Sequence, residues 1–279
     1  MKRVGIIGYP VGHSLSPRFQ QVAFDHFGMD VTYEVWETLP NALFSRVASL
    51  RSDEYLGANV TVPYKEAVVP ILDNLSEEAS LLGAVNTIVH RDGKLTGQNT
   101  DGIGFLQALC DAEFDVERKK VLILGAGGAA RAVAFALARG GVTDLYIANR
   151  NTMRGDNLAM EVNSVAPIAF SIPLTEQELA GISGKYDLLV NTTSVGMRYT
   201  ETDGRTPFPK HLLTSKLLVN DLVYNPPETT LLKDARDAGA DTLGGLGMLV
   251  NQGAASFEIW TAMKAPIDLM LLEAERGLR

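Results

Sequence analysis

Cysteine is almost absent from this chain of 279 residues, with Cys110 as the single example. An internal disulfide is therefore excluded, and a reducing compartment is expected. We expect this thiol to be a small buried hydrophobe rather than a catalytic nucleophile. The four histidines lack the spacing of metal ligands, so no metal is predicted; they are His13, His26, His90 and His211.

Positive charge is also in short supply, because 25 Lys and Arg face 33 Asp and Glu and leave a net charge of −8. A general polyanion-binding surface is therefore not expected, and we predict no nucleic-acid partner. Long hydrophobic runs are missing too, since Arg131 and Arg139 interrupt the longest candidate. We therefore predict no membrane span, no signal peptide and a cytoplasmic protein.

Short apolar runs alternate along the chain with helical patterns, which predicts an α/β fold with mainly parallel sheets. Asp92-Gly93 lies between two short strand-like runs within residues 85–99, which indicates a hairpin and a non-parallel edge on the first sheet. We place domain boundaries near Asp101 and Gly244. The other expected strands are 3–8, 31–37, 58–62, 121–124, 186–193 and 216–224.

A glycine-rich turn opens the second half of the chain, where residues 125–130 read GAGGAA between a predicted strand and a predicted helix. The first glycine of such a turn makes the bend, and the second lets a pyrophosphate approach the backbone. The helix N-terminus then supplies amide protons to the phosphate. The alternative is a turn without a ligand, but the strand-turn-helix context favours dinucleotide binding.

The next strand indicates which dinucleotide is bound. An NAD site usually has Asp or Glu at its end, whereas an arginine suits the 2′-phosphate of NADP. This chain has Asn149, Arg150 and Asn151 there, followed by Arg154. The arginines could simply be solvated loop residues, but a missing acid together with present bases favours NADP.

Lys65 follows Pro63 at the expected start of a helix, which is an unfavourable place for a cation. The helix dipole and partial burial would disfavour the ammonium form, whereas the carboxylate of Asp101 would favour it, and the sequence leaves the balance open. An amine of this kind can take the proton of a secondary alcohol as hydride leaves. Short polar side chains gather in the same half of the chain, and each could also have a purely local role: Ser14, Ser16, Asn59, Thr61, Asn86, Asn99 and Asp101.

Several motifs resemble the shikimate dehydrogenases and occur in order over nearly the whole chain. They include GHSLSP (12–17), NVTVPYK (59–65), NTDG (99–102), LGAGGAARA (124–132), DLVYNP (221–226) and GLGMLVNQ (245–252). The resemblance implies NADPH-dependent, reversible reduction of the small molecule 3-dehydroshikimate to shikimate, in the shikimate pathway of aromatic amino-acid biosynthesis. It also implies a monomer or homodimer.

The resemblance further implies a Rossmann-like NADP-binding domain over 102–244 and a discontinuous substrate-binding domain over 1–101 and 245–279. Lys65 and Asp101 would be the catalytic pair. The implied substrate-binding residues are Ser14, Ser16, Asn59, Thr61, Asn86, Tyr224 and Gln252. The implied cofactor-binding residues are Gly125, Ala126, Gly127, Gly128, Ala129, Asn149, Arg150, Arg154, Thr192, Ser194, Leu222, Gly245 and Met248.

Two alternatives stay open. One is a quinate/shikimate dehydrogenase that uses both NAD and NADP. The other is a ligand-sensing module that kept the fold and lost the chemistry, although the intact Lys65 and Asp101 argue against it. Departures from the family pattern are small: Asn151 stands where many members have Thr, and Thr192 stands where Ala is frequent.

Overall fold

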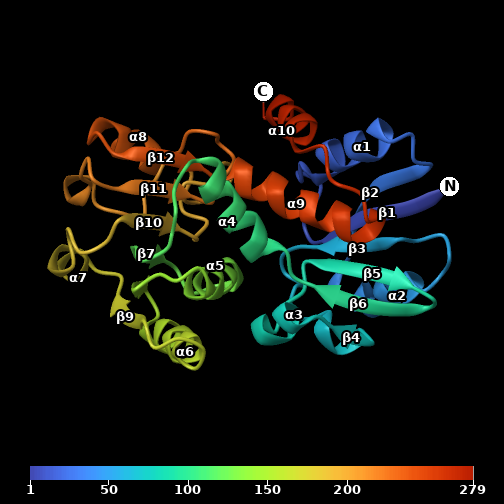
Figure 1. Cartoon of the computed structure of the whole chain (residues 1–279), viewed down its shortest axis with the longest axis horizontal. Coiled ribbons are helices and arrows are strands. Elements are labelled where there is room, and N and C mark those ends of the chain that lie inside the picture. Colours follow the sequence, from blue (N-terminus) through green and yellow to red (C-terminus); the bar gives the residue numbers. More distant parts are fainter. Residues whose placement is uncertain (279) are drawn as a thin grey trace. The chain divides into compact units, whose positions relative to one another are not determined.

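The computed structural model describes residues 1–278 (Figure 1). Its internal contacts divide the chain into two compact units. Unit 1 comprises Met1–Gly104 and Val250–Gly277, and unit 2 comprises Phe105–Leu249. Each unit is built on its own six-stranded sheet, so the expected α/β class with mainly parallel sheets is confirmed.

The sheet of unit 1 has the strand order β2-β1-β3-β5-β6-β4. Strand β1 is parallel to both β2 and β3, whereas β5 is antiparallel to β3 and to β6. Asp92 and Gly93 join β5 to β6 with φ angles of 51° and 75°, which is the left-handed conformation of a tight hairpin turn. The strands are β1 (Lys2–Gly8), β2 (Val31–Glu37), β3 (Gly57–Val60), β4 (Asn74–Leu75), β5 (Thr87–Arg91) and β6 (Lys94–Gln98).

Two helices of unit 1 begin beside a serine that accepts a backbone hydrogen bond. Helix α1 begins at Ser16, but Leu15 is its N-cap residue, and the hydroxyl of Ser14 accepts a hydrogen bond from the Ser16 amide. Ser76 caps α3, because its hydroxyl accepts from the Ala79 amide at 3.1 Å. The helical segments are α1 (Ser16–His26), η1 (Pro40–Ala42), α2 (Leu43–Ser49), η2 (Val69–Ile71), α3 (Glu77–Leu82) and α10 (Ile267–Arg276).

The helix expected at Lys65 does not form. Residues 61–68 make a series of turns that lead into the short 3-10 helix η2. The carbonyl of Lys65 accepts from the Val85 amide at 2.8 Å, so it takes no part in a helical ladder. The proposed influence of a helix dipole on Lys65 is therefore wrong.

The sheet of unit 2 is parallel throughout and has the order β12-β11-β10-β7-β8-β9. The chain adds strands on one side of β7 and then returns to add β10 on the other, so the strand order reverses between β7 and β10. Such a switch point is where open α/β sheets bind ligands. The strands are β7 (Lys120–Leu124), β8 (Asp144–Asn149), β9 (Ala169–Pro173), β10 (Leu188–Asn191), β11 (Leu218–Asp221) and β12 (Asp241–Gly244).

Two helices, α4 (Asp101–Asp111) and α9 (Leu246–Thr261), contain the boundaries between the units. Cys110 lies near the end of α4 and is exposed, so the expectation of a buried thiol is wrong. The helical segments within unit 2 are α5 (Gly128–Arg139), α6 (Thr152–Asn163), α7 (Glu176–Gly181), η3 (Lys210–Leu212) and α8 (Thr230–Asp237).

Each unit has a core of its own. In unit 1, one buried cluster contains Ile7, Val60, Ile88 and Leu95, and all four are strand residues. In unit 2 the corresponding buried side chains come from β7, β10 and β11, together with α8. Packing of each core holds the strands of its sheet in place. The polar groups described below lie at or beyond the ends of those strands.

Candidate active site

Lys65 and Asp101 meet within unit 1. The Lys65 Nζ donates to Asp101 Oδ2 at 2.6 Å, and the two side chains are 26% and 8% exposed. Asp101 is the first residue of α4, and its amide donates to the side chain of Asn99 at 3.0 Å. A short charge-assisted bond of this kind holds an amine in one place while leaving one side open to solvent.

Asn86 connects this pair to the rest of the unit. Its Nδ2 donates to Asp101 Oδ1 and to Thr100 Oγ1, both at 2.8 Å, and to Gln252 Oε1 at 3.2 Å. Its Oδ1 accepts from the Thr100 amide and from Thr87 Oγ1, both at 2.9 Å. The side chain is only 2% exposed, so Asn86 orients its neighbours from inside the protein.

Asn59 is held in the same way behind Asn86. Its Oδ1 accepts from the hydroxyl of Tyr33 at 2.8 Å, and its Nδ2 donates to Ser256 Oγ at 3.0 Å and to Thr87 Oγ1 at 3.2 Å. Burial raises the pKa of Tyr33, while a hydrogen bond with Ser16 acts against that rise. Asn59 therefore joins the sheet to α9, and its polar atoms face protein groups.

Sequence reasoning missed four members of this network, namely Tyr33, Thr87, Thr100 and Ser256. A usable signal exists for Ser256, which follows Gln252 by four residues on α9 and so shares its face. Its hydroxyl also donates to the Gln252 carbonyl at 3.0 Å. The part played by Tyr33 has no local signal, because its partner Asn59 lies on another strand.

Gln252 reaches Asn86 because α4 and α9 approach closely at Gly104. A Cβ at Gly104 would lie 2.5 Å from the Gln252 amide nitrogen, which no side chain allows. A glycine is therefore required there for the glutamine to reach the sheet. Of the other predicted substrate residues, Ser14 and Thr61 are half-buried and Ser16 is buried, and all three lie in unit 1, whereas Tyr224 lies in unit 2.

The glycine turn of unit 2 has the geometry that an anion needs. Gly125 has a φ of 110°, and a Cβ there would lie 2.7 Å from the Thr192 hydroxyl. Gly127 is the N-cap of α5, and neither it nor Gly128 would bring a Cβ within 4 Å of another atom. The first amides of α5 are thus open to approach at the positive end of a twelve-residue helix. Ala126 and Ala129 beside them are half-exposed.

The end of β8 carries the predicted adenosine-side residues. Asn149 Nδ2 donates to the Asn151 carbonyl at 2.8 Å, and Asn151 caps α6 by accepting from the Arg154 amide at 3.2 Å. Asn151 thus performs a capping role that threonine also fills. Arg150 and Arg154 are exposed, and within residues 1–278 neither guanidinium has an acidic partner.

The remaining predicted cofactor residues follow aligned strand ends. Leu124, Asn191, Asp221 and Gly244 are in register across the sheet, so the segments after them begin at one edge. The Thr192 hydroxyl donates to the Leu124 carbonyl at 2.7 Å. The residues at this edge are Thr192, Ser194, Leu222, Tyr224, Gly245 and Met248, and burial raises the pKa of Tyr224.

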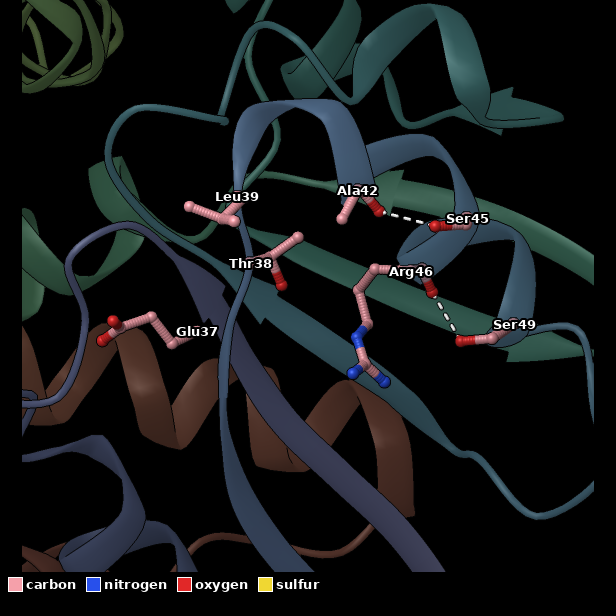
Figure 2. A pocket seen from close by; sticks show the side chains of 7 residues that line it. All are labelled: Glu37, Thr38, Leu39, Ala42, Ser45, Arg46 and Ser49. Carbon is pink, nitrogen blue, oxygen red and sulfur yellow. Dashed lines mark hydrogen bonds between the residues drawn. The ribbon is translucent and has the colours of Figure 1, made fainter.

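A separate hollow of about 380 Å³ adjoins the end of β2, and none of the predicted site residues lines it (Figure 2). The hydroxyls of Ser45 and Ser49 donate to backbone carbonyls, so they are already used within the chain. It offers Arg46 and Glu37 as its charged groups, and Glu37 accepts from the Val11 amide at 3.4 Å. We do not include this hollow in the candidate site.

No helix within residues 1–278 combines the length and apolarity needed to cross a bilayer. Over the same range, no group of three or more His, Cys, Asp or Glu side chains is arranged to hold a metal ion.

The parallel sheet with a glycine turn at its switch point defines unit 2 as a Rossmann-like dinucleotide-binding fold. Three models of protein families match this chain and identify its family within that fold class. The shikimate dehydrogenase substrate binding domain matches residues 6–88, shikimate / quinate 5-dehydrogenase matches residues 108–202, and the shikimate 5′-dehydrogenase C-terminal domain matches residues 245–271. The chain belongs to the shikimate dehydrogenase family.

Individual relatives agree with this assignment. The shikimate dehydrogenase (NADP(+)) of Methanopyrus kandleri is 45% identical over 96% of this chain and 92% of its own length. The crystal structure of shikimate 5-dehydrogenase from Thermus thermophilus, in complex with NADP(H) and shikimate, has a TM-score of 0.90 at 38% identity and covers 100% of both chains. Quinate dehydrogenase from Corynebacterium glutamicum, in complex with NAD, has a TM-score of 0.89 at 31% identity over 99% of both chains.

Proposed function

We propose that this chain is an NADP-dependent shikimate dehydrogenase, which interconverts 3-dehydroshikimate and shikimate in the shikimate pathway. The observation that carries the proposal is the bond of 2.6 Å between Lys65 and Asp101, in a unit lined by buried amides and hydroxyls. Relatives of at least 39% identity that carry this activity by name cover nearly the whole chain.

The residues of unit 2 fit the cofactor. The open amides at Gly127 and Gly128 suit a pyrophosphate, and the exposed guanidiniums of Arg150 and Arg154 suit a 2′-phosphate. No carboxylate stands at the end of β8 to hold a free ribose hydroxyl or repel that phosphate. The remaining cofactor-side residues would come from the turn after β7 and the aligned strand ends, as the family pattern implies.

When bound, NADPH supplies the hydride that forms the new C–H bond at the carbonyl carbon. Lys65 gives its proton to the carbonyl oxygen in reduction and takes it back from the hydroxyl in oxidation. Asp101 holds the amine through Oδ2, and Asn86 holds Asp101 through Oδ1. Ser14, Ser16 and Thr61 would bind the substrate directly, together with Gln252 and Tyr224.

Two members of the predicted substrate set have a different role in this proposal. Asn59 and Asn86 are 5% and 2% exposed, and their amide groups are bonded to protein atoms. We therefore assign them to orienting the residues that touch substrate. The Tyr33 hydroxyl orients Asn59 by donating to its Oδ1, and the Ser256 hydroxyl is hydrogen-bonded to Thr87 Oγ1 in the same network.

A spectrophotometric assay of the purified protein with shikimate or quinate, each with NADP or NAD, tests the proposal. We expect turnover to be highest with shikimate and NADP. Comparable turnover of quinate with NAD would instead identify a quinate/shikimate dehydrogenase with dual cofactor use. An absence of turnover in all four pairings would contradict both and favour a ligand-sensing module.

The setting of the enzyme is part of the proposal. A cytoplasmic location suits a chain whose single cysteine forms no internal disulfide. We expect a monomer or a homodimer, which sedimentation equilibrium would distinguish.

A further inference from the structure

A buried carboxylate at the end of β11 has no part in the chemistry described so far. Asp221 is 0% exposed, and three donors converge on it. Its Oδ1 accepts from Asn191 Nδ2 at 2.8 Å and from the Val223 amide at 3.1 Å, and its Oδ2 accepts from the Thr229 hydroxyl at 2.6 Å. A buried carboxylate costs free energy unless it is bonded in this way.

The bonds of Asp221 extend to two loops and a helix. Asn191 Oδ1 accepts from the amide of Thr193 at 3.0 Å and from its hydroxyl at 2.7 Å, which shapes the turn after β10. The bond from Val223 shapes the turn after β11 in the same manner. Thr229 also caps α8, because its hydroxyl accepts from the Leu232 amide at 3.3 Å.

These two turns carry residues proposed above to bind the cofactor or, in the case of Tyr224, the substrate. Thr192 and Ser194 lie in the turn after β10, and Leu222 and Tyr224 lie in the turn after β11. We propose that Asp221 is a positioning residue for hydride transfer, which fixes the two turns through Asn191 and the Val223 amide, and the start of α8 through Thr229, without touching substrate. This inference rests on the proposed function.

The local chemistry explains why a carboxylate is required. Asp221 meets only donors within the described part of the chain, so an acid that accepts at both oxygens satisfies all of them. In Asp221→Asn the amide would face the Thr229 hydroxyl, whose proton would then lose its acceptor. Burial raises the pKa of Asp221, while the bonds from Thr229, Val223 and Asn191 act in the opposite direction.

The experiment compares Asp221→Asn with a control in the same strand. Val219→Ala removes buried apolar volume from β11 and leaves the polar side chains of Asp221, Asn191 and Thr229 unchanged. For each variant we would measure kcat, the Kd of NADP, the melting temperature, and the isotope effect on kcat with NADPH deuterated at the transferred position. A second pair, Thr229→Val and Thr229→Ser, removes and retains the hydroxyl donor.

For Asp221→Asn we expect kcat to fall by about tenfold to a hundredfold, because small misplacements of reacting groups have effects of that size. The Kd of NADP should stay within about twofold, since the pyrophosphate and 2′-phosphate contacts are elsewhere. The isotope effect should rise as hydride transfer becomes slower. Thr229→Val should change kcat in the same direction, and Thr229→Ser should restore most of it.

An Asp221→Asn enzyme with kcat within twofold of the unmodified protein, or no lower than Val219→Ala, would overturn the inference. Where Asp221→Asn does not fold, equal kcat values for Thr229→Val and Thr229→Ser would overturn it instead. An unmodified protein that fails to turn over shikimate or quinate would refute the proposed function, and the inference would fall with it. Normal turnover with unaffected variants would refute the inference alone.

Discussion

Replacing Tyr33 by phenylalanine tests whether the buried hydrogen-bond network behind the candidate active site is as the structure shows. The change removes one hydroxyl and leaves the ring, which is 6% exposed, in place. Asn59 Oδ1 would then lose its donor, and within residues 1–278 no other donor reaches that oxygen. An unsatisfied buried acceptor costs about 1–3 kcal/mol. A loss of about 2 kcal/mol corresponds to a fall of about 4–8 °C in the melting temperature.

Both tryptophans of the chain, Trp36 and Trp260, belong to unit 1, so their fluorescence follows the unfolding of the unit that contains Tyr33. Circular dichroism follows both units. Tyr186 offers a matched control, because it is 5% exposed and its hydroxyl has no partner among the described residues. Tyr186→Phe should therefore be neutral or slightly stabilising near neutral pH. Equal destabilisation by the two substitutions would refute the role assigned to the Tyr33 hydroxyl.

Three further predictions follow from the site and from burial. Lys65→Ala should lower kcat by about 10²–10⁴-fold with little change in substrate affinity, and an unaltered kcat would remove Lys65 from the mechanism. Arg150→Ala should weaken NADP binding by about tenfold and leave NAD binding nearly unchanged, whereas exposed Arg118→Ala should affect neither cofactor. Burial raises the pKa of Tyr186 from 10.0 to about 12. Below pH 10 the phenol is neutral in both the folded and the unfolded protein, but between pH 10 and about 12 it ionises in the unfolded protein first, so the free energy of unfolding falls over that interval. Tyr186→Phe should therefore gain up to about 3 kcal/mol on the unmodified protein across that interval in urea titrations, and parallel pH profiles would contradict the assignment.

Local signals predicted the parts of the fold that depend on neighbouring residues. The glycine turn at residues 125–128 and the hairpin turn at Asp92-Gly93 need backbone conformations that few residues adopt, so composition reveals them. These elements place the cofactor turn and the sheet edges correctly because each is decided within a few residues.

The missed features depend on partners far away in the chain. Lys65 appeared to start a helix, but its carbonyl bonds to Val85, twenty residues further on, and that contact has no sequence signature. The Asn59 side chain bonds to Ser256 across 197 positions. The sequence around a short polar residue next to a strand is the same whether its side chain faces a ligand or bonds to a neighbouring amide. Only tertiary packing determines which of the two partners it meets.

The two units hold a carboxylate in the same way and use it differently. Asn86 donates to Asp101, and Asn191 donates to Asp221, each from Nδ2 to Oδ1 at 2.8 Å. An asparagine amide can hold a carboxylate in place without adding charge. The role of each carboxylate then depends on the partner of its second oxygen, Oδ2. In Asp101 that oxygen meets the Lys65 ammonium, which can exchange its proton with substrate. In Asp221 it meets the neutral hydroxyl of Thr229, which caps α8, and so we propose that the first carboxylate holds the amine that transfers the proton, while the second positions the two turns.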